Sequence, residues 1–133
     1  MLIAITSEGF NMNSLVEEKF GRSPFIIFYD TENHTFESLR NPYINIFGGA
    51  EIQTAQFIIE KNVAAVIAIE LGANAFHFLK SAGIEVYYCS KEKVMEAVKK
   101  FVEGKLSAIT RVSIKNIEVN RRGKRRRFRN GKF

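Results

Sequence analysis

Three short loops carry the small residues that expose backbone N–H groups to a ligand. One spans residues 7–21 after an apolar run, one spans 47–51 before helical sequence, and one spans 71–74 after a second apolar run. Loops at the carboxyl ends of parallel strands meet at one edge of a sheet, and N–H groups there bind anions. We therefore expect a ligand-binding rim. Its candidate contacts are Ser7, Asn13, Ser14, Arg22, Gly48, Gly49, Gly72 and Asn74.

The same loops allow a simpler interpretation. Gly48, Gly49 and Gly72 are also the residues that turns require. The chain contains neither GxGxxG nor GxxxxGK[ST], so no motif indicates a nucleotide. Glu51 stands in the first turn of the predicted helix, where its carboxylate complements the helix dipole and disfavours an anionic guest. Arg22 leaves two interpretations open: it pairs with an acid and locks the first loop, or it faces an anionic ligand.

Side chains that bind soft metals are few. The chain has a single cysteine, Cys89. A self-sufficient iron–sulfur site generally uses four cysteines, so only a preassembled cluster fits, held by one or two ligands and by backbone hydrogen bonds. His77, on a short helix after "LGAN", and Cys89, at a strand end, are the candidate metal ligands. The alternative is that His77 is an ordinary surface residue and Cys89 a small buried hydrophobe.

Catalytic patterns are absent from the sequence. It contains no GxSxG nucleophile elbow, and the first apolar run carries none of the carboxylates that metal-dependent nucleases need. We therefore expect a protein that is not an enzyme.

The net charge of +6 comes from the end of the chain. Residues 121–133 hold eight of the 20 basic residues and no acid, which leaves 12 basic against 14 acidic residues in 1–120. Such a segment suits a nucleic-acid-binding arm or a solvated, disordered terminus. The candidate nucleic-acid contacts are Arg121, Arg122, Lys124, Arg125, Arg126, Arg127 and Arg129.

The hydrophobic pattern predicts an α/β domain with a mixed sheet covered by helices on both faces. The predicted strands are 2–6, 24–30, 34–41, 62–70 and 84–89. The predicted helices are 51–61, 74–83 with Asn74 as N-cap, and 90–104 with Ser90 as N-cap. We divide the chain into a domain at 1–105, an extension at 106–120 that adds an edge strand or runs over the surface, and a flexible basic tail at 121–133.

The chain contains no apolar run near the roughly 20 residues that a membrane span needs. Its first residues, "MLIAIT", have the pattern of a strand, so no signal peptide is expected there. The lone cysteine rules out an intrachain disulfide framework, so a cytoplasmic protein is expected. Its oligomeric state is not indicated.

Three segments resemble the dinitrogenase iron–molybdenum cofactor biosynthesis family, which comprises NifX-like proteins and the C-terminal domain of NifB. They read "NSLVEEKFGRSPFIIFYD", "NPYINIFGGAEIQTAQFIIEKNVAAVIA" and "LGANAFHFLKSAGIEVYY". The resemblance implies a three-layer α/β/α ribonuclease-H-like fold with a five-stranded mixed sheet, one strand antiparallel. This chain departs from the family pattern at Glu51, where Gly is usual, at Ala73, where Pro is usual, and in its arginine-rich tail.

Two functions from different classes follow. The first, implied by the resemblance, is a carrier in nitrogen fixation that holds an iron–sulfur or iron–molybdenum cluster precursor, or another small ligand, and meets a cluster-assembly protein. The second is a nucleic-acid-associated module that uses the tail as its arm.

Overall fold

The computed structural model describes residues 1–109. Its strands are β1 (Leu2–Ser7), β2 (Phe25–Asp30), β3 (Thr35–Arg40), β4 (Ala65–Ala68), β5 (Glu85–Tyr88) and β6 (Ser107–Ile109). Its helices are α1 (Ala50–Ile59), α2 (Ala73–Ser81), α3 (Val94–Val102) and the one-turn 3-10 helix η1 (Phe20–Arg22). Within these residues no helix combines the length and the apolar character that crossing a membrane requires.

The strands form one mixed sheet in the order β3-β2-β1-β4-β5-β6. β1, β4 and β5 are parallel neighbours, whereas β2 pairs antiparallel with β1 and β3, and β6 pairs antiparallel with β5. The mixed α/β sheet is thus confirmed, but the count of five strands with one antiparallel strand is wrong. The sixth strand arises because Ser107–Ile109 pairs with the outer edge of β5, an edge whose backbone groups would otherwise lack partners.

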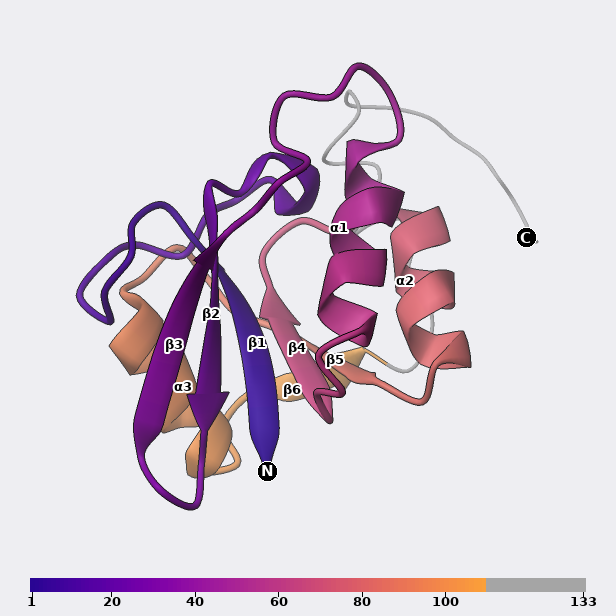
Figure 1. Cartoon of the computed structure of the whole chain (residues 1–133). Coiled ribbons are helices and arrows are strands. Elements are labelled where there is room, and N and C mark those ends of the chain that lie inside the picture. The colour runs from indigo at the N-terminus through magenta and orange to yellow at the C-terminus, as the bar shows by residue number, and fades with distance from the viewer. Residues whose placement is uncertain (110–133) are drawn as a thin grey trace.

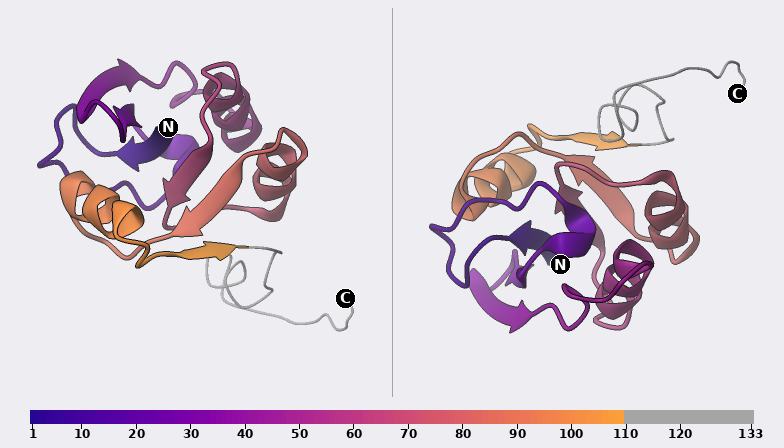
Figure 2. Two further views of the ribbon diagram at one scale, coloured as in Figure 1. Left: turned by 90° about the horizontal axis from the view of Figure 1, so that it is seen from below. Right: turned by 90° about the horizontal axis from the view of Figure 1, so that it is seen from above.

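The helices lie on both faces of the sheet. Figures 1 and 2 show α1 and α2 side by side on one face and α3 on the other. The alternation of side chains along β1 serves both layers: Ala4 belongs to the core under α1 and α2, while Ile3 and Ile5 belong to the core under α3. All three are fully buried. An apolar run without polar residues is what a central strand covered on both faces requires.

The long connection after β1 packs onto the α3 side before it crosses to the other face. Val16 is fully buried in the core under α3. Its N–H donates to the carbonyl of Glu92 at 2.8 Å, and the N–H of Val94 donates to the carbonyl of Ser14 at 2.8 Å. Only the end of this connection, with η1, reaches the face that carries α1. The segment 7–21 therefore divides its residues between two sides of the sheet.

Two predicted helix starts are wrong. The N-cap of α2 is Gly72 rather than Asn74, and the N-cap of α3 is Lys93 rather than Ser90. Gly72 makes no side-chain capping hydrogen bond, and its own N–H donates to the Glu51 carboxylate at 3.0 Å. α3 begins later than predicted because Lys93 still pairs with Leu15 in an isolated β-bridge.

Candidate functional site

A cavity of about 560 Å³ opens where η1, the start of α1 and the β4–α2 loop meet. It lies beyond the carboxyl ends of β1 and β4, two neighbouring parallel strands. The sheet continues from β1 to β2 on one side and from β4 to β5 on the other. Open α/β sheets bind ligands outside the carboxyl ends of two such strands. The volume of the cavity suits a small molecule. The lining residues are Lys19, Phe20, Gly21, Arg22, Ala50, Glu51, Glu70, Gly72, Ala73 and Asn74.

Two glycines allow the walls of the cavity to approach one another. A Cβ atom on Gly21 would lie 2.9 Å from the backbone nitrogen of Glu51, so only glycine lets η1 pack directly on α1. A Cβ atom on Gly72 would lie 2.5 Å from Oε1 of Glu51. Gly48 and Gly49 differ, since both have a positive φ, of 84° and 75°, and nothing lies within 4 Å of their Cβ positions. Their geometry suits a turn.

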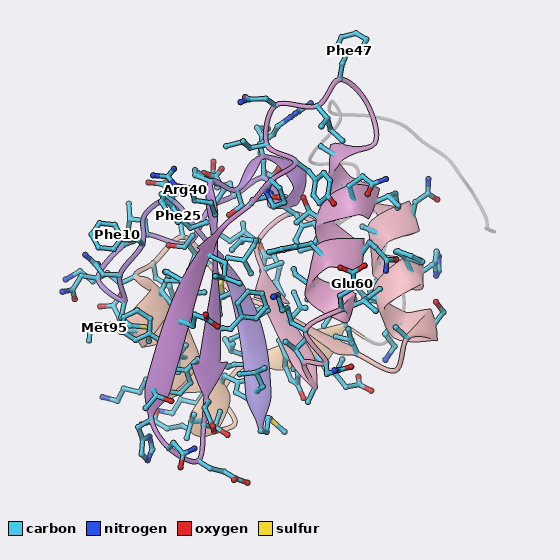
Figure 3. All side chains as sticks on the ribbon, in the orientation of Figure 1. Phe10, Phe25, Arg40, Phe47, Glu60 and Met95 are labelled. Atoms are coloured by element: carbon cyan, nitrogen blue, oxygen red, sulfur yellow. The ribbon has the colours of Figure 1, made fainter. Side chains whose placement is uncertain are left out.

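Arg22 fastens the loop that precedes α1. Its Nη1 donates to the carbonyl oxygens of Ile44 at 2.8 Å and Ile46 at 3.0 Å. The residue thus locks the loop at 41–49 rather than the first loop, and it does so through carbonyls rather than through an acid. Phe47, at the tip of this loop, is fully exposed and points away from the body of the protein in Figure 3. The tip therefore adds nothing to the cavity lining.

Glu51 joins the starts of the two helices that flank the cavity. It lies in the first turn of α1, and its Oε2 accepts the hydrogen bond from the N–H of Gly72, the N-cap of α2. Burial raises the pKa of the Glu51 carboxyl, the hydrogen bond from Gly72 opposes that rise, and the charge of Glu70 adds to it. Glu70 is itself 3.9 Å from the Nζ of Lys19. The cavity lining thus contains both acidic and basic side chains.

The raised pKa of Glu51 predicts how its replacement affects stability with pH. Because the carboxyl binds its proton more tightly in the folded protein, its ionisation costs stability at neutral pH, and that cost disappears as pH falls through the folded pKa. Glu51→Gln stays uncharged and keeps an oxygen that accepts from Gly72. Relative to wild type, Glu51→Gln should therefore be more stable at pH 7 than at pH 4, as measured by its free energy of unfolding in urea.

Glu37→Gln is the control, since it removes an exposed carboxylate from β3. Its difference from wild type should change little over the same range. The prediction would be contradicted if the stability difference between Glu51→Gln and wild type did not change with pH, or if the variant gained stability relative to wild type toward pH 4.

The structure brings some of the candidate contacts together and separates others. Arg22, Gly72 and Asn74 line the cavity. Ser7 is fully buried, and its Oγ donates to the carbonyl of Gly9 at 2.6 Å. The candidate contacts outside the cavity lining are Ser7, Asn13, Ser14, Gly48 and Gly49.

Sequence reasoning missed several of the lining residues as contacts. Lys19 and Glu70 carry no motif, and only their pairing across an isolated β-bridge places them at the cavity. Gly21 had a signal, because a glycine inside "FGRSP" marks a place of close backbone approach.

The two candidate metal ligands lie on different faces of the sheet. His77 is exposed on α2, and its ring contacts Phe76 edge-on with centroids 5.5 Å apart. Cys89 is buried in the core under α3. Among residues 1–109, no three His, Cys, Asp or Glu side chains gather in a way that could hold a metal ion. One cluster therefore cannot use both candidates at once.

Cys89 is predicted to be unreactive in the folded protein. Burial, with a smaller contribution from the charge of Glu92 and against the opposing charge of Lys100, raises the pKa of its thiol to about 12. At pH 8 about one molecule in ten thousand would then carry the reactive thiolate. Native protein should be labelled by a thiol reagent to less than about one tenth in an hour, whereas protein unfolded in guanidinium should be labelled fully. Full labelling of the native protein would contradict the prediction.

The predicted basic arm lies outside the described residues. Its candidate contacts, from Arg121 to Arg129, follow residue 109, where the description ends. The nucleic-acid interpretation therefore stays a prediction from composition.

Comparisons with known proteins identify a matching family and several similar proteins. The family model described as dinitrogenase iron-molybdenum cofactor matches residues 1–104. An uncharacterised protein from Methanocaldococcus jannaschii is 30% identical over 97 residues, which are 71% of this chain and 82% of that protein.

Solved structures show the same similarity. The apo form of the orange protein from Desulfovibrio gigas superposes with a TM-score of 0.79 at 28% identity, covering 82% of this chain and 92% of that one. A Thermotoga protein of the DUF35 family, described as a candidate NifB protein, superposes with a TM-score of 0.73 at 35% identity, covering 84% and 96%.

Proposed function

The chain belongs to the dinitrogenase iron-molybdenum cofactor family, and from this premise we propose that it is a non-enzymatic carrier. Its cargo is a metal–sulfur cluster precursor, or another small ligand, held in the cavity between η1, α1 and α2. The observation that carries the proposal is the meeting of three separate chain segments around that cavity at the carboxyl ends of β1 and β4. We also propose that the fold is related to that of ribonuclease H, as the family resemblance implies.

The donors on this chain suit temporary holding better than construction of a cluster. No group of three ligating side chains forms within residues 1–109. The thiol of Cys89 stays protonated because burial raises its pKa to about 12, and a metal ligand must be deprotonated. We therefore propose that the cargo arrives preassembled and is held by backbone N–H groups and polar side chains of the cavity. His77, which lies on α2 outside the cavity lining, is the candidate side-chain ligand. A cluster-assembly protein is the partner that this mode of action requires.

The optical spectrum and metal content of protein prepared without oxygen test the proposal. Protein reconstituted with ferrous iron and sulfide should show charge-transfer absorption and retain iron after desalting. His77→Ala should lower the retained iron if His77 is a ligand, while Lys80→Ala, on the same helix, serves as its control. Absence of both absorption and retained iron in the wild type would overturn the carrier function.

A further inference from the structure

The Glu51 carboxylate places a negative charge on the wall of the cavity. Glu51 lines the cavity, and its Oε2 accepts the hydrogen bond from the N–H of Gly72 at 3.0 Å. The absence of a side chain at Gly72 leaves the room that this carboxylate fills, since a Cβ atom there would lie 2.5 Å from Oε1. The carboxylate therefore occupies the position from which a guest's acceptor atom would meet this N–H group.

The neighbouring charges do not neutralise Glu51. Glu70, just beyond β4, adds a second negative charge and raises the pKa of the Glu51 carboxyl further than burial alone. On the η1 side, Lys19 lies 3.9 Å from Glu70, and Arg22 donates to the carbonyls of the 41–49 loop. α2 contributes Asn74 to the lining and no charged side chain. An anionic guest would thus approach a carboxylate whose hydrogen-bond donor, among residues 1–109, is a backbone amide.

We propose that Glu51 is the specificity-determining residue of this cavity, and that its carboxylate excludes anionic ligands until a proton neutralises it. This inference rests on the proposed carrier function for its biological meaning. It assigns the class of guest that binds at neutral pH as uncharged or cationic, and it makes entry of an anionic guest an event that takes up a proton. Acidification then favours loading of an anionic guest, and a return to neutral pH favours its release.

Sulfate is the probe, because it remains a dianion between pH 4.5 and pH 8. Calorimetric titration of the full chain at pH 7.5 and pH 4.5 compares wild type with Glu51→Gln, which keeps the acceptor oxygen but not the charge. Glu60→Gln, at the other end of α1 in Figure 3, is the matched control. Titration in buffers of different ionisation enthalpy counts the protons taken up for each sulfate bound.

At pH 7.5 Glu51→Gln should bind sulfate at least about tenfold more tightly than wild type, because the repelling charge is gone. A tenfold difference corresponds to about 1.4 kcal/mol. Wild type and Glu60→Gln should bind sulfate more tightly at pH 4.5 than at pH 7.5 and take up protons on binding, whereas Glu51→Gln should show a smaller change in both quantities. Glu51→Ala repeats the comparison without the amide, and circular dichroism confirms that each variant is folded.

Equal sulfate affinity and equal proton uptake in wild type and Glu51→Gln would overturn the inference, as would failure of Glu51→Gln to bind sulfate at all. The carrier function is judged separately by iron retention. If the wild type retains no iron but Glu51→Gln gains sulfate affinity, the carrier function fails and the charge selectivity of the cavity stands. If the wild type retains iron but Glu51→Gln gains no sulfate affinity, the carrier function stands and this inference fails.

Discussion

Phe20→Ala is expected to lower the free energy of unfolding by about 3–5 kcal/mol, the usual range for removal of a buried aromatic ring. The side chain is 1% exposed and lies in the core shared with α1 and α2. It also lines the cavity, so its loss leaves a void that joins the ligand site. Because small domains have about 5–15 kcal/mol of stability in total, urea unfolding should show a much earlier transition.

Phe47→Ala is the control for this variant. The ring of Phe47 is fully exposed at the tip of the 41–49 loop (Figure 3). Its removal should change the free energy of unfolding by no more than about 0.5 kcal/mol. Equal losses from the two Phe→Ala variants would show that Phe20 is not the packed residue that the structure describes.

Gly21→Ala is expected to destabilise the protein by about 1–3 kcal/mol through overpacking. The added Cβ atom would lie 2.9 Å from the nitrogen and 3.0 Å from the Cα of Glu51, and 3.2 Å from the carbonyl carbon of Ala50. These are backbone atoms, which cannot rotate away as a side chain can. The contact therefore pushes η1 away from α1 and widens one wall of the cavity.

Amide hydrogen exchange distinguishes this steric effect from a general loss of stability. In Gly21→Ala the N–H groups at the start of α1 should exchange faster than they do in the wild type, with a smaller change in the rest of the helix. Gly104→Ala is the comparison, because that glycine has a φ of 75° and nothing within 4 Å of its Cβ position. It should lose stability through backbone strain alone, without faster exchange in α1. Identical exchange patterns in the two variants would contradict the close approach at Gly21.

The sheet could be predicted largely from sequence because its central strands are apolar runs. Ile3, Ala4 and Ile5 are fully buried, so their pattern follows directly from cover on both faces. β6 has only three residues, two of them exposed, and pairs with β5 through its backbone. Backbone pairing by so short an edge strand leaves little signal in the side chains. The sequence therefore left open whether residues 106–120 add an edge strand, and the count of five strands came from the family resemblance.

The rim was harder to predict because its details depend on contacts between distant residues. The start of α2 could not be inferred from Asn74, because its N-cap is Gly72, which has no capping side chain and whose N–H donates to Glu51 of another helix. The connection after β1 looked like a single polar loop, yet Val16 draws it into the core under α3. Small residues thus indicated where chain segments meet, but not which side chains line the meeting place.

The central claim is that the cavity between η1, α1 and α2 holds the cargo. Ala73 lines this cavity at the start of α2, and Ala82 is exposed at the opposite end of the same helix. A tryptophan at the first position takes up part of the cavity, and one at the second leaves it open, so Ala73→Trp and Ala82→Trp form a matched pair.

Iron retained after anaerobic reconstitution with ferrous iron and sulfide is the measurement that decides the claim. Wild type and Ala82→Trp are predicted to retain the same amount and to show the same charge-transfer absorption, while Ala73→Trp retains less than about one tenth, because a bulky ring in the lining obstructs the site. A folded Ala73→Trp protein that retains as much iron as wild type would contradict the account.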